Sequence, residues 1–234
     1  RLLEAGRPAR KPIKKQLLTE AMKTKRLTWA KKYENWTVED WKRVLFSDES
    51  HFIAQGQQIR FIRKGNEKLN SSHVVQATKH PPKKMFWGCF SYYGVGPLVP
   101  VTGMMNSEKY QPILVERMLP EMKKRWPNGE GFFQQDLASC HTSKNMVKFF
   151  KESHVTVLDR SGNSPEINPI ENLWAICKNW MSKLDCTTVE KLISTIIHAW
   201  LKDKRMLSTC RDLVESMPKR VKLLVEAKGG HIKY

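Results

Sequence analysis

The sequence predicts an α/β fold in which a mixed β-sheet carries helices on both faces. Short apolar segments typical of strands come first, and later strands alternate with segments of helical spacing. Apolar residues make up 40% of the 234 residues and charged residues 27%, as in globular domains of a size that buries a substantial core. We therefore expect one domain whose sheet has three antiparallel strands followed by parallel strands.

The first part of the chain is basic and then helical. Residues 1–12 contain two prolines among basic side chains, and we expect a basic linker there. From Ile13 to about Tyr33 the apolar residues recur with helical spacing, which predicts a helix. Thr37 and Asp40 then have the spacing of a helix start.

Strands are predicted where apolar runs follow, at 44–52, 84–90, 98–102, 131–136 and 154–158. Residues 55–83 interrupt this pattern, because they are rich in Gln, Asn, Ser and Lys and contain one short strand-like piece at Ile59–Arg63. A polar excursion of this length within a domain is usually functional or disordered. We interpret it as a hairpin arm.

Helices are predicted between and after the later strands. One opens at Ser107 and is expected to kink at Pro120. Thr187 and Glu190 have the spacing of a capping box. The remaining helices are expected at 143–152, 169–184, up to about 201, 208–216 and 218–228.

The charge balance indicates a polyanionic partner. Lys and Arg number 41 against 23 acids, so the net charge is +18 and the pI is about 9.8. Residues 1–35 alone carry 11 basic and 3 acidic side chains. Such a segment commonly follows a phosphate backbone, which favours nucleic acid as the partner. The alternative is a soluble basic protein or a ribosomal type of structural component.

The cysteines and the apolar runs indicate the compartment. Five scattered cysteines, an odd number without zinc-ligand spacing, make a disulfide framework unexpected and favour a reducing intracellular location. No apolar run approaches the roughly 20 residues that span a bilayer, so no membrane partner is expected. The chain begins at Arg1 without an apolar leader, and we expect a fragment without an export signal.

Three acids fall where a sheet-edge site would need them. Asp48 lies in the first predicted strand, Asp136 closes a later one, and Glu171 lies in the first turn of a helix that starts at Pro169. If the two strands are parallel neighbours, both aspartates reach the same edge of the sheet, where ligand sites gather. Three clustered carboxylates suit hard divalent cations, and two such ions catalyse phosphoryl transfer.

Each acid also has an ordinary interpretation. Asp48 or its neighbour Glu49 would then face solvent at a strand end, and Asp136 would serve a turn. Asn168 and Glu171 have the spacing of a capping box around Pro169. Taken singly, the capping role of Glu171 is favoured over catalysis, and only the three acids together favour a metal site.

Four strings resemble the mariner superfamily of transposases, and its Tc-type branch in particular: SDESHF, KMFWGCFSYYGVGPL, FFQQDLASCHTS and NSPEINPIENLW. The ending GGHIKY is similar to the end of that branch, and the 34 residues between Asp136 and Glu171 match its spacing. The resemblance runs from about Ile13 to Tyr234. It implies an RNase H-like catalytic domain over 13–234, with the segment at about 55–83 as a clamp loop.

The resemblance also implies a function. Asp48, Asp136 and Glu171 would be the catalytic ligands of Mg²⁺, for which Mn²⁺ substitutes, in cut-and-paste transposition in the nucleus. The partners would be DNA, as transposon ends and target, and a second copy of the chain through the clamp loop. His141 and Asn172 are expected to line the site, although His141 equally suits a structural hydrogen bond at a helix start.

The sequence departs from the family pattern at several positions. Leu137 and Ser139 stand where Asn and Pro are usual, Glu166 replaces Asp, and Ile62 replaces Trp. The first two favour an alternative function, a domesticated and catalytically weak protein that binds DNA or chromatin. The family's paired helix-turn-helix has no counterpart here, so we expect this chain to bind DNA with little sequence specificity.

Overall fold

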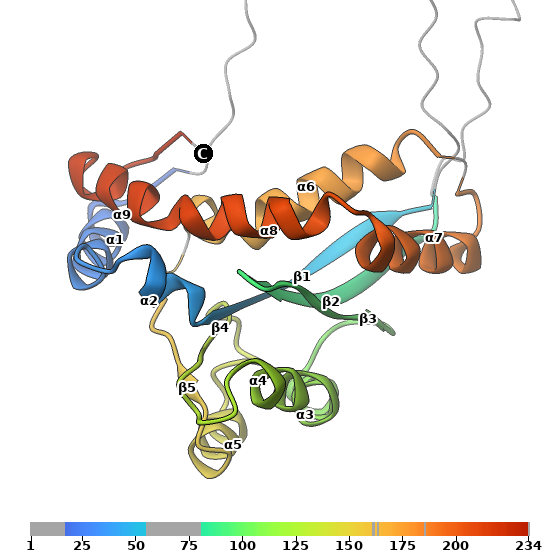
Figure 1. Cartoon of the computed structure of the whole chain (residues 1–234), viewed down its shortest axis with the longest axis horizontal. Helices are drawn as coiled ribbons and strands as arrows, with labels where there is room; N and C mark the ends of the chain where they lie inside the picture. The colour runs from blue at the N-terminus through green and yellow to red at the C-terminus, as the bar shows by residue number, and fades with distance from the viewer. Residues whose placement is uncertain (1–16, 55–80, 161, 163, 185, 234) are drawn as a thin grey trace, which may run out of the picture.

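The fold is built on a mixed sheet with the strand order β3-β2-β1-β4-β5 (Figure 1). The computed structural model describes residues 17–54, 81–160, 162, 164–184 and 186–233. Strands β1 to β3 are antiparallel, and β4 and β5 continue from β1 in parallel, as predicted. The strands are β1 Val44–Ile53, β2 Lys83–Ser91, β3 Gly94–Val101, β4 Phe132–Gln134 and β5 Thr156–Val157.

Helices cover both faces of this sheet (Figure 1). One face carries α1 Glu20–Lys32, α2 Val38–Lys42, α6 Ile170–Met181, α7 Val189–Lys202, α8 Met206–Glu215 and α9 Met217–Glu226. The other face carries α3 Ser107–Ile113, the π-helical stretch η2 Leu114–Met118, α4 Leu119–Arg125 and α5 Lys144–Glu152. The prediction of a layered α/β fold is therefore confirmed.

The alternation of side chains along β1 divides the core in two. Phe46 packs with Trp41, Trp174 and the helices of the first face. Its neighbour Leu45 packs into the second core with α3, α4 and α5. Because successive residues of a strand point to opposite faces, each core receives every second side chain of β1.

Two helix starts differ from the sequence prediction. The helix expected from Ile13 begins at Glu20, because the Thr19 hydroxyl accepts a hydrogen bond from the Met22 amide at 3.2 Å and caps it. The cap of α7 is Thr188 rather than Thr187. The box of Thr37 with Asp40 before α2 is confirmed. The expected linker at 1–12 and most of the expected arm, residues 55–80, lie outside the described residues.

The helix predicted from Ser107 stays helical through Pro120, and the expected kink there stays a prediction. Asn106, not Ser107, caps it. The wider π-helical turn Leu114–Met118 precedes the proline, which then stands at the second position of α4. Proline lacks the N–H that a helix interior uses; the hydrogen-bond pattern changes in the wider turn just before it, and the chain is helical on both sides. Strands β4 and β5 are shorter than predicted, and β3 begins at Gly94 rather than after a turn there.

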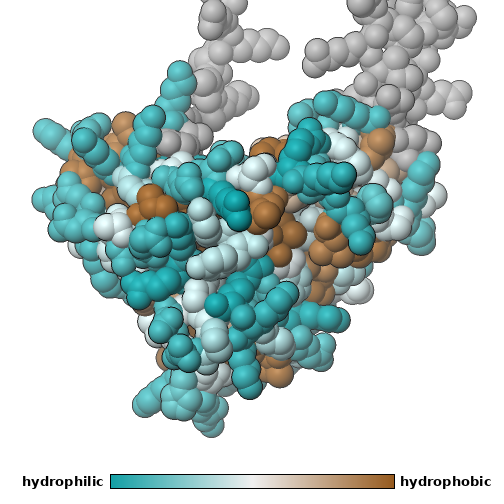
Figure 2. Space-filling model, viewed as in Figure 1, coloured by the Kyte–Doolittle hydropathy of each residue, from teal (hydrophilic) through white to brown (hydrophobic). Residues whose placement is uncertain are grey.

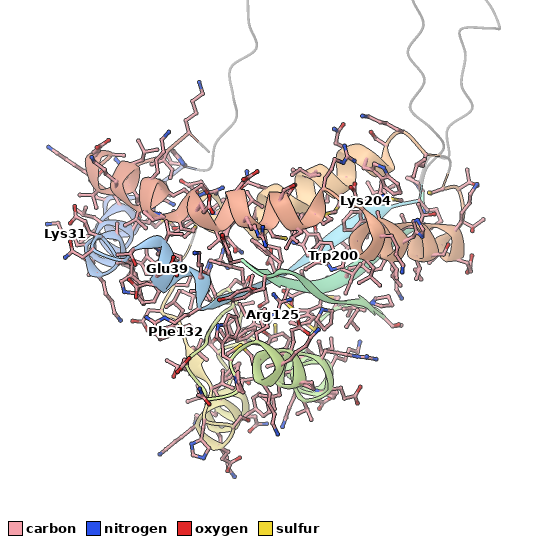
Figure 3. The ribbon with its side chains drawn as sticks, in the orientation of Figure 1. Lys31, Glu39, Arg125, Phe132, Trp200 and Lys204 are labelled. Atoms are coloured by element: carbon pink, nitrogen blue, oxygen red, sulfur yellow. The ribbon has the colours of Figure 1, made fainter. Side chains whose placement is uncertain are left out.

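The β2–β3 hairpin is held from both faces of the sheet. Arg125 on α4 donates hydrogen bonds to the carbonyl oxygens of Gly94 at 3.1 Å and Val95 at 3.0 Å. From the other face, the indole of Trp200 on α7 donates to the Gly96 carbonyl at 2.8 Å. Figure 3 labels both side chains on their two sides of the sheet. These bonds satisfy edge carbonyls that would otherwise be buried unpaired.

The surface and the cysteines agree with an ordinary reduced globular domain. The face shown in Figure 2 is mostly hydrophilic, with small scattered apolar patches. All five cysteines lie in the described part and are free. Among the described residues, none of the helices combines the length and the apolar character that a membrane span requires.

Candidate active site at the edge of the sheet

The register of two parallel strands brings the two predicted aspartates to one edge of the sheet. Phe46 of β1 pairs with Gln134 of β4, and Asp48 and Asp136 each follow two residues later. The Ser47 hydroxyl donates a hydrogen bond to the Gln134 carbonyl at 2.8 Å and joins the strands at this point. Neighbouring strands run about 4.8 Å apart, so both acids leave the sheet in the same region.

Glu171 approaches Asp48 from the helical layer. It lies in the first turn of α6, which packs across β1. Burial, and then the negative charge of Glu171, raises the pKa of Asp48 to about 8. Helix α6 begins without a side-chain cap, and Glu171 is exposed. The effect of its charge on Asp48 indicates that Glu171 lies near Asp48, and a shared metal site for the three predicted acids stays a prediction.

A glycine lets α6 come this close to the sheet. Gly88 on β2 is the direct cross-strand partner of Asp48. A β-carbon at Gly88 would lie 2.6 Å from the ring of Trp174, which is fully buried and cannot move aside. Trp174 is one helical turn from Glu171, so the absence of a side chain at Gly88 lets the start of α6 lie close to the strands that carry Gly88 and Asp48.

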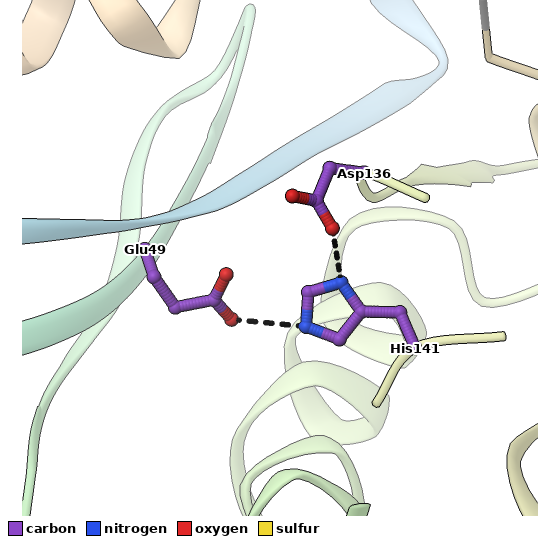
Figure 4. A group of neighbouring side chains, drawn as sticks. All are labelled: Glu49, Asp136 and His141. Atoms are coloured by element: carbon purple, nitrogen blue, oxygen red, sulfur yellow. Dashed lines mark hydrogen bonds and ion pairs between the residues drawn. The ribbon is translucent and has the colours of Figure 1, made fainter. Parts of the chain in front are cut away.

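Glu49, the neighbour of Asp48, takes part in a different group on the opposite face of β1. Its carboxylate oxygen lies 3.3 Å from Nε2 of His141, and Nδ1 of the same ring is hydrogen-bonded to Oδ1 of Asp136 (Figure 4). One ligand atom of each residue lies within 4.8 Å of the others. Because the imidazole itself fills the space between the two acids, we interpret the group as a carboxylate–imidazole–carboxylate chain.

His141 is fixed by its surroundings. The residue is 3% exposed, and its ring lies against that of Tyr110 with centroids 4.1 Å apart. The Tyr110 hydroxyl donates to the Gln135 side chain at 2.8 Å, and the Gln135 amide donates to the His141 carbonyl at 3.3 Å. These contacts hold the imidazole in one orientation beside Asp136.

The protonation of Asp136 differs from that of Asp48. Burial favours the neutral form of Asp136, but hydrogen bonds from His141 and from the Ala138 amide outweigh it and keep the pKa of Asp136 below its ordinary value. Burial likewise opposes a charge on His141, yet bonds to Asp136 and Glu49 raise its pKa to about 10. Both bonds to Asp136 use Oδ1. Its Oδ2 has no hydrogen bond among the described residues.

Two helices far apart in the sequence hold the segment that leads into α6. The buried Arg26 of α1 donates to Ser164 Oγ at 2.9 Å and to the Gly229 carbonyl at 2.7 Å, and it pairs with Glu166. Gly229 has φ of +78°, and a β-carbon there would lie 2.0 Å from the Lys23 carbonyl oxygen. Only glycine fits where α9 meets α1. Glu166, which departs from the family pattern, therefore has a buried partner.

Arg220 of α9 also holds the segment before α6, and we call this set of contacts made by Arg26 and Arg220 the clasp. It explains the position of Asn172. Its guanidinium donates to the Glu166 carbonyl at 2.8 Å and to the Asn172 side-chain oxygen at 2.9 Å. Asn172 thus anchors the first turn of α6, one residue after Glu171. Whether Asn172 also lines the site stays a prediction.

The structure includes residues that sequence reasoning missed. The sequence assigns Glu49 no role beyond facing solvent at a strand end, and its pairing with His141 depends on contacts between distant segments. Strand alternation was the available signal, because it sends Glu49 to the face opposite Asp48. Leu137 is 54% exposed beside Asp136. Ser139 is exposed as well.

The donor set suits hard divalent cations. Asp48 and Glu171 offer carboxylate oxygens, and burial, followed by the charge of Glu171, raises the pKa of Asp48. Asp136 offers the oxygen that His141 does not use. Oxygen donors of this kind are those that Mg²⁺ and Mn²⁺ prefer.

Known proteins are similar to this sequence over its whole length. The chain is 32% identical to the transposable element Tcb2 transposase of Caenorhabditis briggsae and covers 86% of it. It is 30% identical to the transposable element Tc1 transposase of Caenorhabditis elegans, again with 86% covered. The chain belongs to the Tc1/mariner family of transposases. No protein-family model matches it.

Solved Tc1/mariner structures have the same fold. The Mos1 transposase paired-end complex with left transposon end superposes with a TM-score of 0.84 at 15% identity, covering 99% of this chain and 70% of that one. The catalytic domain of Mos1 mariner transposase superposes with a TM-score of 0.73 at 15% identity, covering 94% of this chain and all of that one. The RNase H-like fold that the resemblance implied is confirmed.

Proposed function

We propose that this chain is a DNA transposase domain that cuts and joins DNA with Asp48, Asp136 and Glu171 as ligands of divalent cations. The observation that carries the proposal is the meeting of a strand, a second strand end and a helix start at one edge of the sheet, in a chain with a net charge of +18. Membership of the Tc1/mariner family supports the same function.

Each acid would hold the ions in its own way. Among the described residues no cation is hydrogen-bonded to Asp48 or Glu171, and Asp136 presents Oδ2 while His141 and the Ala138 amide hold Oδ1. Bound Mg²⁺ or Mn²⁺ would supply positive charge to the attacking and leaving oxygens of a phosphodiester. Solved Mos1 paired-end complexes with Mn and with Mg support the use of either ion.

The chain's own groups prepare the site for cations. Near neutral pH the Asp48 carboxyl holds a proton, because its pKa is about 8. Cation binding requires that proton to leave, so affinity should rise as the pH rises toward 8. Asp136 needs no such change, because its pKa is below the ordinary value. His141 orients Asp136 and does not itself need to move a proton.

The individual reaction steps that we propose are those implied by the family resemblance. We propose hydrolysis at element ends, followed by attack of the freed 3′-hydroxyl on target DNA, inside the nucleus. The partners would be the transposon ends, the target DNA and a second copy of the chain. Paired-end complexes of Mos1 support a DNA-bound assembly. The arm at about 55–83, which would join two copies, lies outside the described residues except for 81–83.

A plasmid-nicking assay tests the proposed function. The 234-residue chain is incubated with supercoiled DNA and Mg²⁺ or Mn²⁺, beside Asp136→Asn and the control Asp212→Asn. Asp212 is an exposed acid on α8. We expect Asp136→Asn to lose more than about 100-fold in rate, since even partners of metal ligands cost 10- to 100-fold. Asp212→Asn should match the wild type.

The same assay separates the alternative function. Nicking at an equal background level by the wild type and Asp136→Asn, with DNA binding retained, would show a DNA-binding protein that no longer cleaves. Leu137 and Ser139, which replace the usual residues after Asp136, are the positions to restore in that case.

A further inference from the structure

We propose that Arg160 binds a phosphate of DNA beside the three acids and is therefore a further substrate-binding residue of this site. The inference rests on the proposed function, since it assumes that DNA enters the carboxylate edge. Arg160 lies three residues beyond β5, on the segment that leads towards α6.

Arg160 lies at the junction of two pockets. A pocket of about 560 Å³ is bounded by α5 and by the segments after β4 and β5, with Asp136, His141 and Arg160 in its wall. A second pocket of about 360 Å³ lies against α1 and is lined by Lys25 and Lys32. Both pockets share the side chains of Leu137, Asp159 and Arg160. A strand passing from α1 to α5 would therefore cross Arg160 next to Asp136.

The guanidinium of Arg160 lacks a partner that a phosphate would supply. Its Nη1 atom is buried and has no hydrogen-bond partner among the described residues. A buried donor left unpaired is costly, and most such groups in folded proteins have a partner. Guanidinium groups bind phosphate oxygens with paired hydrogen bonds, which makes arginine the preferred residue for this contact.

The charge of Arg160 is already directed at the acids. It opposes the effects of burial and Glu171 on the pKa of Asp48, and it helps to lower the pKa of Asp136. With divalent cations on the acids, this arginine would face like charges instead. An anion between them removes that conflict, and the DNA phosphate is the anion that the proposed reaction brings.

This arrangement predicts effects of opposite sign for Arg160→Gln. Loss of the guanidinium should weaken DNA binding, because a phosphate loses its partner. It should strengthen binding of Mn²⁺ in the absence of DNA, because a positive charge beside the ligands is gone. A merely structural role would weaken both, since a disturbed site holds neither ligand well.

The first measurement is DNA affinity. A fluorescent duplex of arbitrary sequence is titrated with the full chain in Ca²⁺, a hard cation with oxygen ligands, over a range of salt concentrations. We expect Arg160→Gln to bind about tenfold more weakly and to lower the salt slope by about 1. Arg160→Lys should keep the slope and recover part of the affinity.

The matched control is Arg205→Gln, the same chemical change at an exposed arginine. Arg205 pairs with Asp203 between α7 and α8, next to Lys204, which Figure 3 labels far from β4. This variant should bind DNA and Mn²⁺ like the wild type. This control distinguishes the effect of removing any one positive charge from the effect of removing Arg160 in particular.

The second measurement is Mn²⁺ affinity by calorimetry without DNA. We expect Arg160→Gln to bind Mn²⁺ about three- to tenfold more tightly, because a like charge is removed. Unchanged DNA affinity and slope in Arg160→Gln would overturn the inference, while cleavage that still depends on Asp136 would leave the proposed function standing. Weakened binding of both ligands also overturns it. A wild-type chain that binds neither DNA nor Mn²⁺ overturns both proposals.

Discussion

The two faces of strand β1 treat neighbouring acids in opposite ways. On one face burial, together with the negative charge of Glu171, raises the pKa of Asp48 to about 8. On the other face Glu49 meets His141, which also bonds Asp136 and keeps the pKa of Asp136 low. On the Asp48 side the charge of Arg160 offsets these effects only in part, whereas on the other side His141 is hydrogen-bonded directly to Asp136. A carboxylate site can therefore combine one acid that has no directly bonded cation with another acid that has one.

The largest expected effect comes from removing the internal cation. His141→Phe leaves Asp136 and Glu49 near each other without the imidazolium, and we expect a loss of about 3 kcal/mol in the free energy of unfolding. Urea denaturation measures it. The pKa of His141 is raised to about 10, so its contribution is fully present below about pH 6.5 and is lost as the pH rises through 10.

The matching control is His141→Asn, whose amide can still donate to Asp136. It should retain part of the stability and most of the Mn²⁺ affinity. A phenylalanine variant as stable as the wild type at pH 6 would show that the two acids need no compensation.

The next effect tests how closely α6 packs against the strands that carry Gly88 and Asp48. Gly88→Ala places a β-carbon against the buried Trp174 ring, and we expect a loss of about 2–3 kcal/mol from overpacking. Because the shift moves Glu171 away from Asp48, Mn²⁺ affinity should fall as well. Denaturation and calorimetry give the two readings. Lower stability with unchanged Mn²⁺ affinity would separate packing at Gly88 from the position of Glu171.

Asp48→Asn should act in the opposite direction. The folded, metal-free chain holds a proton on Asp48 that the unfolded chain releases, so wild-type stability falls as the pH rises from about 4 to about 8. We expect the variant to be more stable by about 2 kcal/mol at pH 8 and equal near pH 4. Thermal melts without metal measure this. Added Mg²⁺ should stabilise only the wild type. A destabilised variant at pH 8 would contradict the comparison.

The smallest effect concerns the hydrogen bond of Ser47 that joins β1 to β4. Ser47→Ala removes the hydrogen bond to the Gln134 carbonyl and should cost about 1 kcal/mol. The control is Ser208→Ala, an exposed hydroxyl on α8 that bonds only within its own helix turn. Urea denaturation should separate the two by that amount, and equal stabilities would show that the β1–β4 register does not depend on Ser47.

Local signals placed most of the strands and pointed to the three acids, and the family resemblance implied the RNase H-like sheet, whereas long-range contacts were out of reach. Apolar runs placed β1 and β4, and the strand ends pointed to Asp48 and Asp136. The start of α1 was misplaced because helical spacing extends beyond the Thr19 cap. The pairing of Glu49 with His141 and the approach of Trp174 to Gly88 join segments far apart in the sequence, and no local pattern encodes them.

The clasp of α1 and α9 on the segment before α6 bears on when this chain becomes competent during its own synthesis. Arg26 leaves the ribosome early, whereas Arg220 and the carbonyl of Gly229 are among the last described groups to appear. Until then the turn that carries Glu171 lacks its anchors. We therefore expect a nascent chain to hold two of the acids on the sheet while the third is still unsecured, so that the proposed cutting of DNA begins only after translation has passed the last helix.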